Sequence, residues 1–160
     1  MMDLIRYLSV NPVIVLLPPA LILALFLRTG SGPERLARAL FLLPLGIGRL
    51  ISCVRVLFFY EETNSLLGLD PHHFQYKIGL ANLGLGIASL LAFRKSFSFC
   101  LGTAVYAIVF LGGIWIGRLL HYLAGLSPAE SFWTLGGKSL LLILLAGSLF
   151  FWHRKNSRSA

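Results

Sequence analysis

The sequence has few charged residues, and acidic residues are the scarcest of them. Charged residues make up 12% of the 160 positions, about half the share found in a soluble domain. Hydrophobic residues make up 57%. This composition excludes an ordinary soluble domain. It indicates an integral membrane protein short enough to form a single transmembrane domain over residues 1–160.

Cysteine is also scarce, and the two that occur, Cys53 and Cys100, fall inside apolar segments. They are predicted to lie at different depths in a membrane, so no disulfide between them is expected. The default role of each is that of a small buried hydrophobe. No serine or cysteine has a predictable histidine or carboxylate partner at its own depth. The sequence therefore does not favour a nucleophilic enzyme.

Long apolar runs dominate what remains, and five of them stand out. They cover roughly residues 7–27, 36–60, 74–93, 99–123 and 132–152. Each is close to the ~20 residues that a helix needs to cross a bilayer, and lipid forces the backbone to be helical. The predicted fold is an all-α bundle of five transmembrane helices. Pro18 and Pro19 predict a kink in the first span, which Arg28 closes like an anchor, although a cleaved signal peptide remains an alternative.

The connecting segments alternate in charge. The first loop, the third loop and the tail carry Arg28, Arg35, Arg38, Arg94, Lys95, Arg154, Lys155 and Arg158. The second loop has only acidic charges and the fourth has only Glu130. Because basic loops stay in the cytoplasm, the sequence predicts an outside N-terminus and a cytoplasmic C-terminus in the cytoplasmic (inner) membrane. The net charge of +8 is then explained by loops that contact membrane lipids, and no nucleic-acid partner is expected.

Helical periodicity divides the third span into distinct faces. A lipid-facing stripe is predicted at Tyr76, Leu80, Leu83, Ile87 and Leu90. Two further stripes of small and polar residues, Lys77-Ala81-Gly84-Ala88 and Gln75-Gly79-Asn82-Gly86-Ser89, predict a central helix covered by protein on two faces. In the fourth span, Gly113-x-x-x-Gly117 predicts another contact face, within the chain or in a homo-oligomer or larger complex.

The predicted topology gathers cations in the outer half of the bundle. Four spans contribute Arg55, Lys77, Arg118, His121 and Lys138, while Glu61, Glu62 and Asp70 lie at the outer mouth. Ionisable groups inside a membrane are costly and are usually paired or functional.

Two interpretations of these charges stay open. The acids can neutralise the cations in a purely structural ion-pair network. Alternatively, the cations line a pocket for an anion, with Asn82 orienting the ligand by hydrogen bonding. His72 and His73 have the chemistry of zinc ligands, but no ligand spacing is diagnostic. No metal site and no cofactor is predicted.

Residues 70–93, DPHHFQYKIGLANLGLGIASLLAF, resemble an uncharacterised family of small microbial multi-pass membrane proteins, a domain of unknown function. The matching positions are Phe74-Gln75, Gly79, Ala81-Asn82-Leu83 and Gly86, which follow a Phe-Gln…Ala-Asn-Leu-x-x-Gly core motif. The likeness extends over roughly residues 36–152 and implies a multi-helix membrane fold with no assigned activity.

The chain departs from this family at its charged positions. Lys77 stands where the family usually has Glu, and Arg55 and Arg118 stand where it often has His. The change toward positive charge favours an anion-binding or a structural role over metal or proton chemistry.

The leading hypothesis is a protein that binds or transports an anionic small molecule or a lipid headgroup. The alternatives are an accessory membrane subunit, or a lipid-active enzyme that uses His121 with Glu61 or Glu62 as acid and base.

Overall fold

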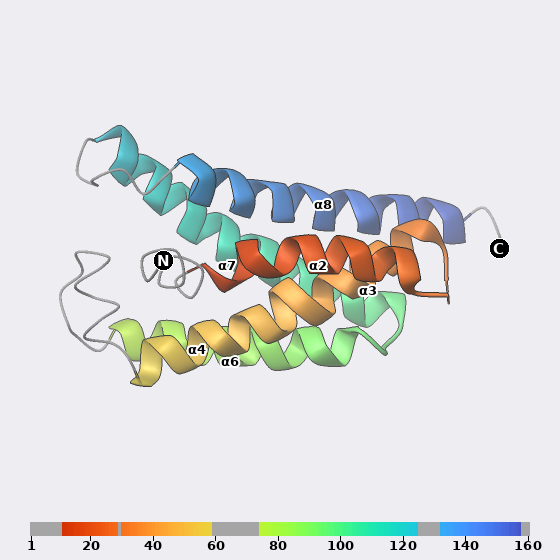
Figure 1. Ribbon diagram of the computed structural model, residues 1–160, viewed down its shortest axis with the longest axis horizontal. Coiled ribbons are helices and arrows are strands. Elements are labelled where there is room, and N and C mark those ends of the chain that lie inside the picture. Colours follow the sequence, from red (N-terminus) through yellow and green to blue (C-terminus); the bar gives the residue numbers. More distant parts are fainter. Residues whose placement is uncertain (1–10, 29, 59–73, 125–131, 158–160) are drawn as a thin grey trace.

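The structure is a computed structural model that describes residues 11–28, 30–58, 74–124 and 132–157, and every regular element in these ranges is helical. The elements are α2 (Pro12–Phe26), α3 (Gly32–Leu40), the π-helix η1 (Phe41–Ile47), α4 (Gly48–Phe58), α6 (Phe74–Ala92), α7 (Phe97–Leu123) and α8 (Phe132–Asn156). Because α3, η1 and α4 follow one another without a break, they form one long rod. The described residues thus make five rods lying side by side (Figure 1).

Each rod overlaps one of the five apolar segments, so the all-α fold class is confirmed for the described residues. Three stretches are long and apolar enough to cross a membrane: Gly32–Phe58, Phe97–Gly117 and Gly136–Lys155. The apolar helices Pro12–Phe26 and Tyr76–Ala92 are shorter. The second rod begins at Gly32, four residues before the predicted start at 36. Pro33 in the first turn and the Glu34 carboxylate, which accepts a hydrogen bond from the Ser31 N–H at 3.4 Å, start the helix there.

The π-helical turn in the second rod is centred on Pro44. Proline has no N–H to donate and its ring collides with the carbonyl four residues earlier, so a regular α-helix cannot run through it unchanged. Here the backbone widens, and the N–H of Gly48 donates to the carbonyl of Leu43, five residues back. The rod therefore passes Pro44 without ending.

Glycines bring α6 close to this rod. A Cβ on Gly86 would lie 2.9 Å from Leu50 Cδ2 and 3.3 Å from the carbonyl oxygen of Gly46. A Cβ on Gly79 would lie 2.7 Å from Leu57 Cδ2. The predicted stripe of Gly79, Asn82, Gly86 and Ser89 is thus buried against protein, as expected from small residues at a helix contact.

The remaining predictions for the faces of α6 and α7 are confirmed only in part. Of the predicted lipid-facing stripe, Tyr76, Leu80 and Ile87 are exposed. Leu83 and Leu90 are half-buried, and Leu90 packs against Gly46 of η1. The second α6 stripe is not covered, because Lys77 and Gly84 are exposed, so one face rather than two is buried. In α7, a Cβ at Gly102, Gly113 or Gly117 would meet no heavy atom within 4 Å. The GxxxG face is therefore no contact within the described part of the chain.

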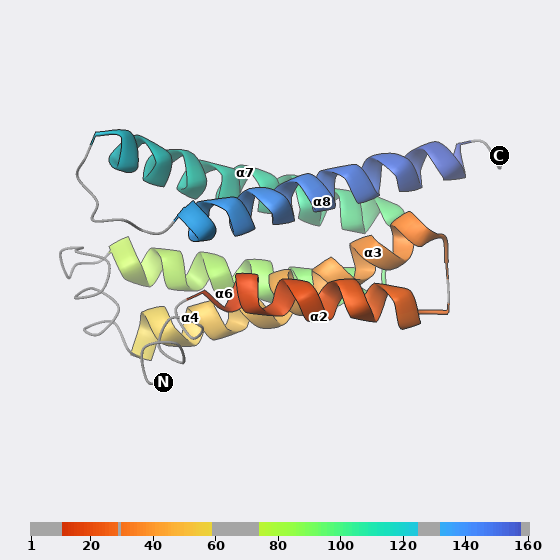
Figure 2. The same ribbon diagram turned by 45° about the horizontal axis from the view of Figure 1, so that its top comes forward.

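The buried hydrophobic core draws residues from α2, α3, η1, α6, α7 and α8, and α2, α3 and η1 contribute several that are fully buried. Ala20, Ala37, Leu40 and Phe41 are fully buried there. Gly137 of α8 approaches Ile14 of α2, with a Cβ-to-Cγ1 distance of 2.8 Å if a Cβ is added. In Figure 2, α7 and α8 form one layer over α2, α4 and α6.

Candidate functional site

The segments predicted to carry the cationic site lie at one end of the bundle. The C-terminal end of α4, the N-terminal end of α6, the C-terminal end of α7 and the N-terminal end of α8 are all found there (Figures 1 and 2). Arg55 and Lys138 are partly buried, and Lys77 is exposed. Arg118 and His121 belong to α7, but their side chains lie outside the described part of the structure.

The predicted acidic partners Glu61, Glu62 and Asp70 also lie outside the described residues. Arg55 and Lys138 each already interact with another part of the protein, through a hydrogen bond, an ion pair, a ring contact or a longer-range charge interaction. The described geometry therefore brings the helix ends together and leaves both interpretations of their charges open.

Asn82 is buried, with 4% of its surface exposed, and its partner is Arg49. The Arg49 Nη1 donates to the Asn82 Oδ1 at 3.4 Å, and the Asn82 Nδ2 donates to the Ile78 carbonyl at 3.0 Å. Arg49 itself is only 8% exposed. Asn82 thus binds a buried guanidinium inside the bundle.

The register of the two helices shows where that guanidinium goes. Leu50 packs on Gly86 and Leu57 packs on Gly79, so the antiparallel backbones place residue 49 level with residue 87. Asn82 lies five residues closer to the cationic end, which is about 7 Å along a helix. The Arg49 side chain consequently extends toward the end of the bundle that carries Arg55 and Lys77.

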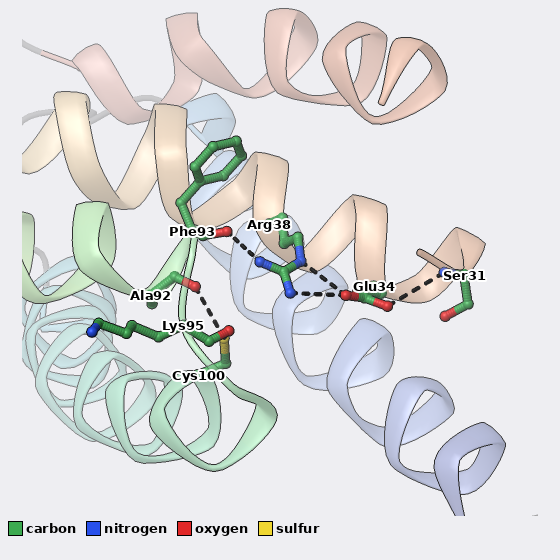
Figure 3. Close-up of polar contacts among 7 residues, drawn as sticks. All are labelled: Ser31, Glu34, Arg38, Ala92, Phe93, Lys95 and Cys100. Atoms are coloured by element: carbon green, nitrogen blue, oxygen red, sulfur yellow. Dashed lines mark hydrogen bonds and ion pairs between the residues drawn. The ribbon is translucent and has the colours of Figure 1, made fainter. Parts of the chain in front are cut away.

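A polar cluster that the sequence analysis missed lies at the opposite end (Figure 3). The Arg38 Nη2 and Nε contact the Glu34 Oε1 at 2.9 and 3.0 Å, and its Nη1 donates to the carbonyl oxygen of Phe93. Arg38 therefore ties α3 to the C-terminal end of α6. The four-residue spacing of Glu34 and Arg38 was a usable signal for the ion pair, but the bond to Phe93 spans 55 positions.

Aromatic rings extend this cluster to α8. The Arg38 guanidinium lies 5.5 Å from the centre of the Trp152 ring, in cation–π geometry. Phe97 meets Trp152 edge to face at 5.0 Å and stacks on His153 at 5.6 Å. Trp152 is 4% exposed, so it is a buried packing residue rather than the lipid-facing anchor that its position near a span end suggests.

Cys100 supports the turn between α6 and α7. Its Sγ donates to the Ala92 carbonyl at 3.2 Å and lies 3.9 Å from that of Lys95 (Figure 3). Cys53 is buried in α4, and both thiols are free. The expected buried position of both cysteines is confirmed, and Cys100 adds a polar contact.

A groove opens beside the Arg38 cluster, between the start of α3 and the end of α8. It is an open groove of about 480 Å³, lined by Pro33, Phe151, Arg154 and Lys155. None of these residues was among the predicted site residues. No group of three His, Cys, Asp or Glu side chains in the described ranges could hold a metal; His72 and His73 lie outside those ranges.

Together these features define a helical protein with the composition and helix lengths of a membrane protein. Residues 9–159 match a family described as a family of unknown function, DUF6790, and the chain belongs to that family. The match agrees with the expected uncharacterised family, whereas the core motif and the microbial origin stay predictions. No curated protein matches the chain, and no solved structure does so either.

Proposed function

We propose that this protein binds or transports an anionic small molecule or lipid headgroup at the cationic end of its bundle. In this proposal the five rods are membrane spans in the cytoplasmic membrane, with the N-terminus outside and the C-terminus inside. Arg55, Lys77, Arg118 and Lys138 recognise charge, with His121 beside them, and Asn82 orients the deepest cation.

The buried Arg49 is the observation that carries the proposal. Its guanidinium extends along the contact between α4 and α6 toward the end that bears Arg55 and Lys77. Arg49 also has a further interaction within the chain, and Glu34, the one acid in the described ranges, is engaged by Arg38 at the other end. Arg49, Arg55 and Lys77 together place positive charge from the inside of the bundle to its end. Such an arrangement suits a ligand with phosphate or carboxylate groups, which arginine binds through its planar guanidinium.

A thermal-shift series with soluble anions tests this function. The purified protein in a neutral detergent would be unfolded with and without inorganic phosphate, acetate and glycerol phosphate. An anion present at 100 times its dissociation constant stabilises the folded state by about 2.7 kcal/mol, so binding raises the midpoint. Arg55→Gln is expected to abolish the shift without much change in the midpoint of the free protein.

Arg28→Gln is the matched control, because Arg28 is exposed and lies on the turn after α2, at the other end of the bundle. It removes the same charge and should leave the shift intact. If no anion shifts the midpoint, or if Arg55→Gln responds like the wild type, the cationic end is not the binding site.

One observation favours a second function, that of an accessory membrane subunit. Arg55 and Lys138 already interact within the chain, as side chains of a structural network do. In that case Arg55→Gln should lower the midpoint of the free protein by several degrees. Removing one partner of a fully buried ion pair costs about 3–5 kcal/mol, and the partly buried Arg55 should cost less than this. The same thermal-shift series therefore separates the two functions.

A further inference from the structure

The groove at the end opposite the proposed site has two kinds of lining. Pro33 from the first turn of α3 and Phe151 from α8 supply its apolar lining. Arg154 and Lys155 from the last turn of α8 give it two positive charges. Both side chains are exposed, and Lys155 also interacts with another part of the protein. This combination fits an amphipathic anion better than a small, fully hydrated one.

The apolar and the cationic residues that line the groove lie at different heights along α8. Phe151 and Arg154 are three residues apart, about 4.5 Å along the axis and nearly one turn, so they lie on the same face of α8. The apolar helix stretch Gly136–Lys155 ends at these cations. If α8 crosses a membrane, Phe151 lies at the level of the first acyl carbons and Arg154 at the level of the phosphates.

The walls of the groove are held in place by the Arg38 cluster. Arg38 links α3 to the end of α6 and to Trp152, which is the neighbour of Phe151 in α8. Glu34, the one acid in the described ranges, follows Pro33 directly, and its carboxylate is engaged by Arg38. An anion entering the groove therefore meets a preformed site in which the adjacent carboxylate is already neutralised.

We propose that this groove between α3 and α8 is a binding site for an anionic phospholipid, with the phosphate at Arg154 and Lys155 and an acyl chain against Phe151 and Pro33. The charge complementarity commits the site to a lipid with a net negative headgroup, of which phosphatidylglycerol is the simplest. The site is separate from the proposed anion pocket and does not depend on it.

Fluorescence anisotropy of phosphatidylglycerol labelled on its acyl chain tests the proposal with the full-length protein in a neutral detergent. Arg154→Gln/Lys155→Gln should weaken binding roughly 25-fold, about fivefold from each cation. Arg94→Gln/Lys95→Gln is the matched control. It removes the same charge from exposed positions at the same end of the bundle and should change the affinity less than about threefold.

The apolar half of the site has its own pair of variants. Phe151→Ala should weaken binding about fivefold or more, because it removes one of the two apolar side chains that line the groove. Phe150→Ala is its control, since Phe150 is exposed next to it but does not line the groove. All six positions changed in these variants carry exposed side chains, so the variants are expected to fold.

Several results would overturn the proposal. If Arg154→Gln/Lys155→Gln and Arg94→Gln/Lys95→Gln weakened lipid binding equally, the lipid would be attracted to the basic surface in general and not bound in the groove. Displacement by millimolar inorganic phosphate would mean a free-anion site, and equal binding of phosphatidylcholine would mean that charge is not recognised. Arg55→Gln should leave this affinity unchanged, so failure here is distinguishable from failure of the anion pocket.

Discussion

At the residue scale, Arg38 and Arg49 have different environments, and we assign them different roles. Arg38 is partly buried and has an acid, a backbone carbonyl and an aromatic ring as partners. Arg49 is almost fully buried in the middle of the bundle and donates to the neutral amide of Asn82. Arg38 is held by these partners at one end of the bundle, whereas Arg49, which also has a further interaction within the chain, extends toward Arg55 and Lys77. This contrast is why we assign stability to Arg38 and ligand binding to the end that Arg49 approaches.

Arg38→Gln is predicted to lower the free energy of unfolding by about 2 kcal/mol. The variant loses the ion pair with Glu34 and weakens the bond to the Phe93 carbonyl, and hydrogen bonds to charged groups contribute about 1.5–3 kcal/mol. Partial exposure of the pair keeps the expected value at the lower end. Unfolding in detergent, followed by circular dichroism, measures the change.

Arg94→Gln is the comparison for that variant, because Arg94 is exposed one residue beyond Phe93. It should alter the stability by less than about 0.5 kcal/mol. Equal effects of the two substitutions would show that Arg38 contributes only its charge, and that the link between α3, α6 and α8 does not stabilise the fold.

At the element scale, one face of α6 determines how closely it packs on the second rod. The sequence predicted this face correctly, because glycines and polar residues recur there at helical spacing. It wrongly predicted a second covered face, since Lys77 and Gly84 satisfy the same periodicity while remaining exposed. Small residues allow a close contact, but only the neighbouring helix decides whether one forms.

Gly86→Ala and Gly84→Ala test this difference on a single helix. The added methyl group at Gly86 would meet Leu50 Cδ2 at 2.9 Å and the Gly46 carbonyl oxygen at 3.3 Å, and the backbone oxygen cannot move aside as a side chain can. We expect a loss of about 1–3 kcal/mol in unfolding free energy. At Gly84 nothing lies within 4 Å, so alanine should be neutral or slightly stabilising. Similar values for the two variants would contradict the close contact between α6 and η1.

At the scale of the whole molecule, hydropathy predicted the rods better than it predicted the sites. Five apolar segments correspond to the five described rods because burial in lipid or protein acts on every residue of a span. The π-helical turn was not predicted, since a proline inside an apolar run equally permits a kink. The Arg38 cluster was missed because it requires α3, α6 and α8 to dock first, and its contact with Phe93 joins residues 55 positions apart.

The orientation of the whole molecule gives a further prediction. If basic loops are cytoplasmic, Asn64→Cys should react with a membrane-impermeant maleimide on intact cells, and Ser159→Cys should react only after permeabilisation. The native Cys53 and Cys100 are buried, so the unmodified chain is the unreactive control. The reverse labelling pattern would invert the topology, and the cationic end would then face the cytoplasm.

Native mass spectrometry of the protein extracted with its own lipids tests the central claim, anion binding at the cationic end, most directly. The spectra of the wild type, Arg55→Gln and Arg154→Gln/Lys155→Gln would be compared for bound species. Our account predicts an anionic species that Arg55→Gln loses and the double variant keeps. If the wild type binds no anionic species, or if Arg55→Gln retains every anionic species that the wild type binds, the account is contradicted and the cations of this end serve the stability of the bundle.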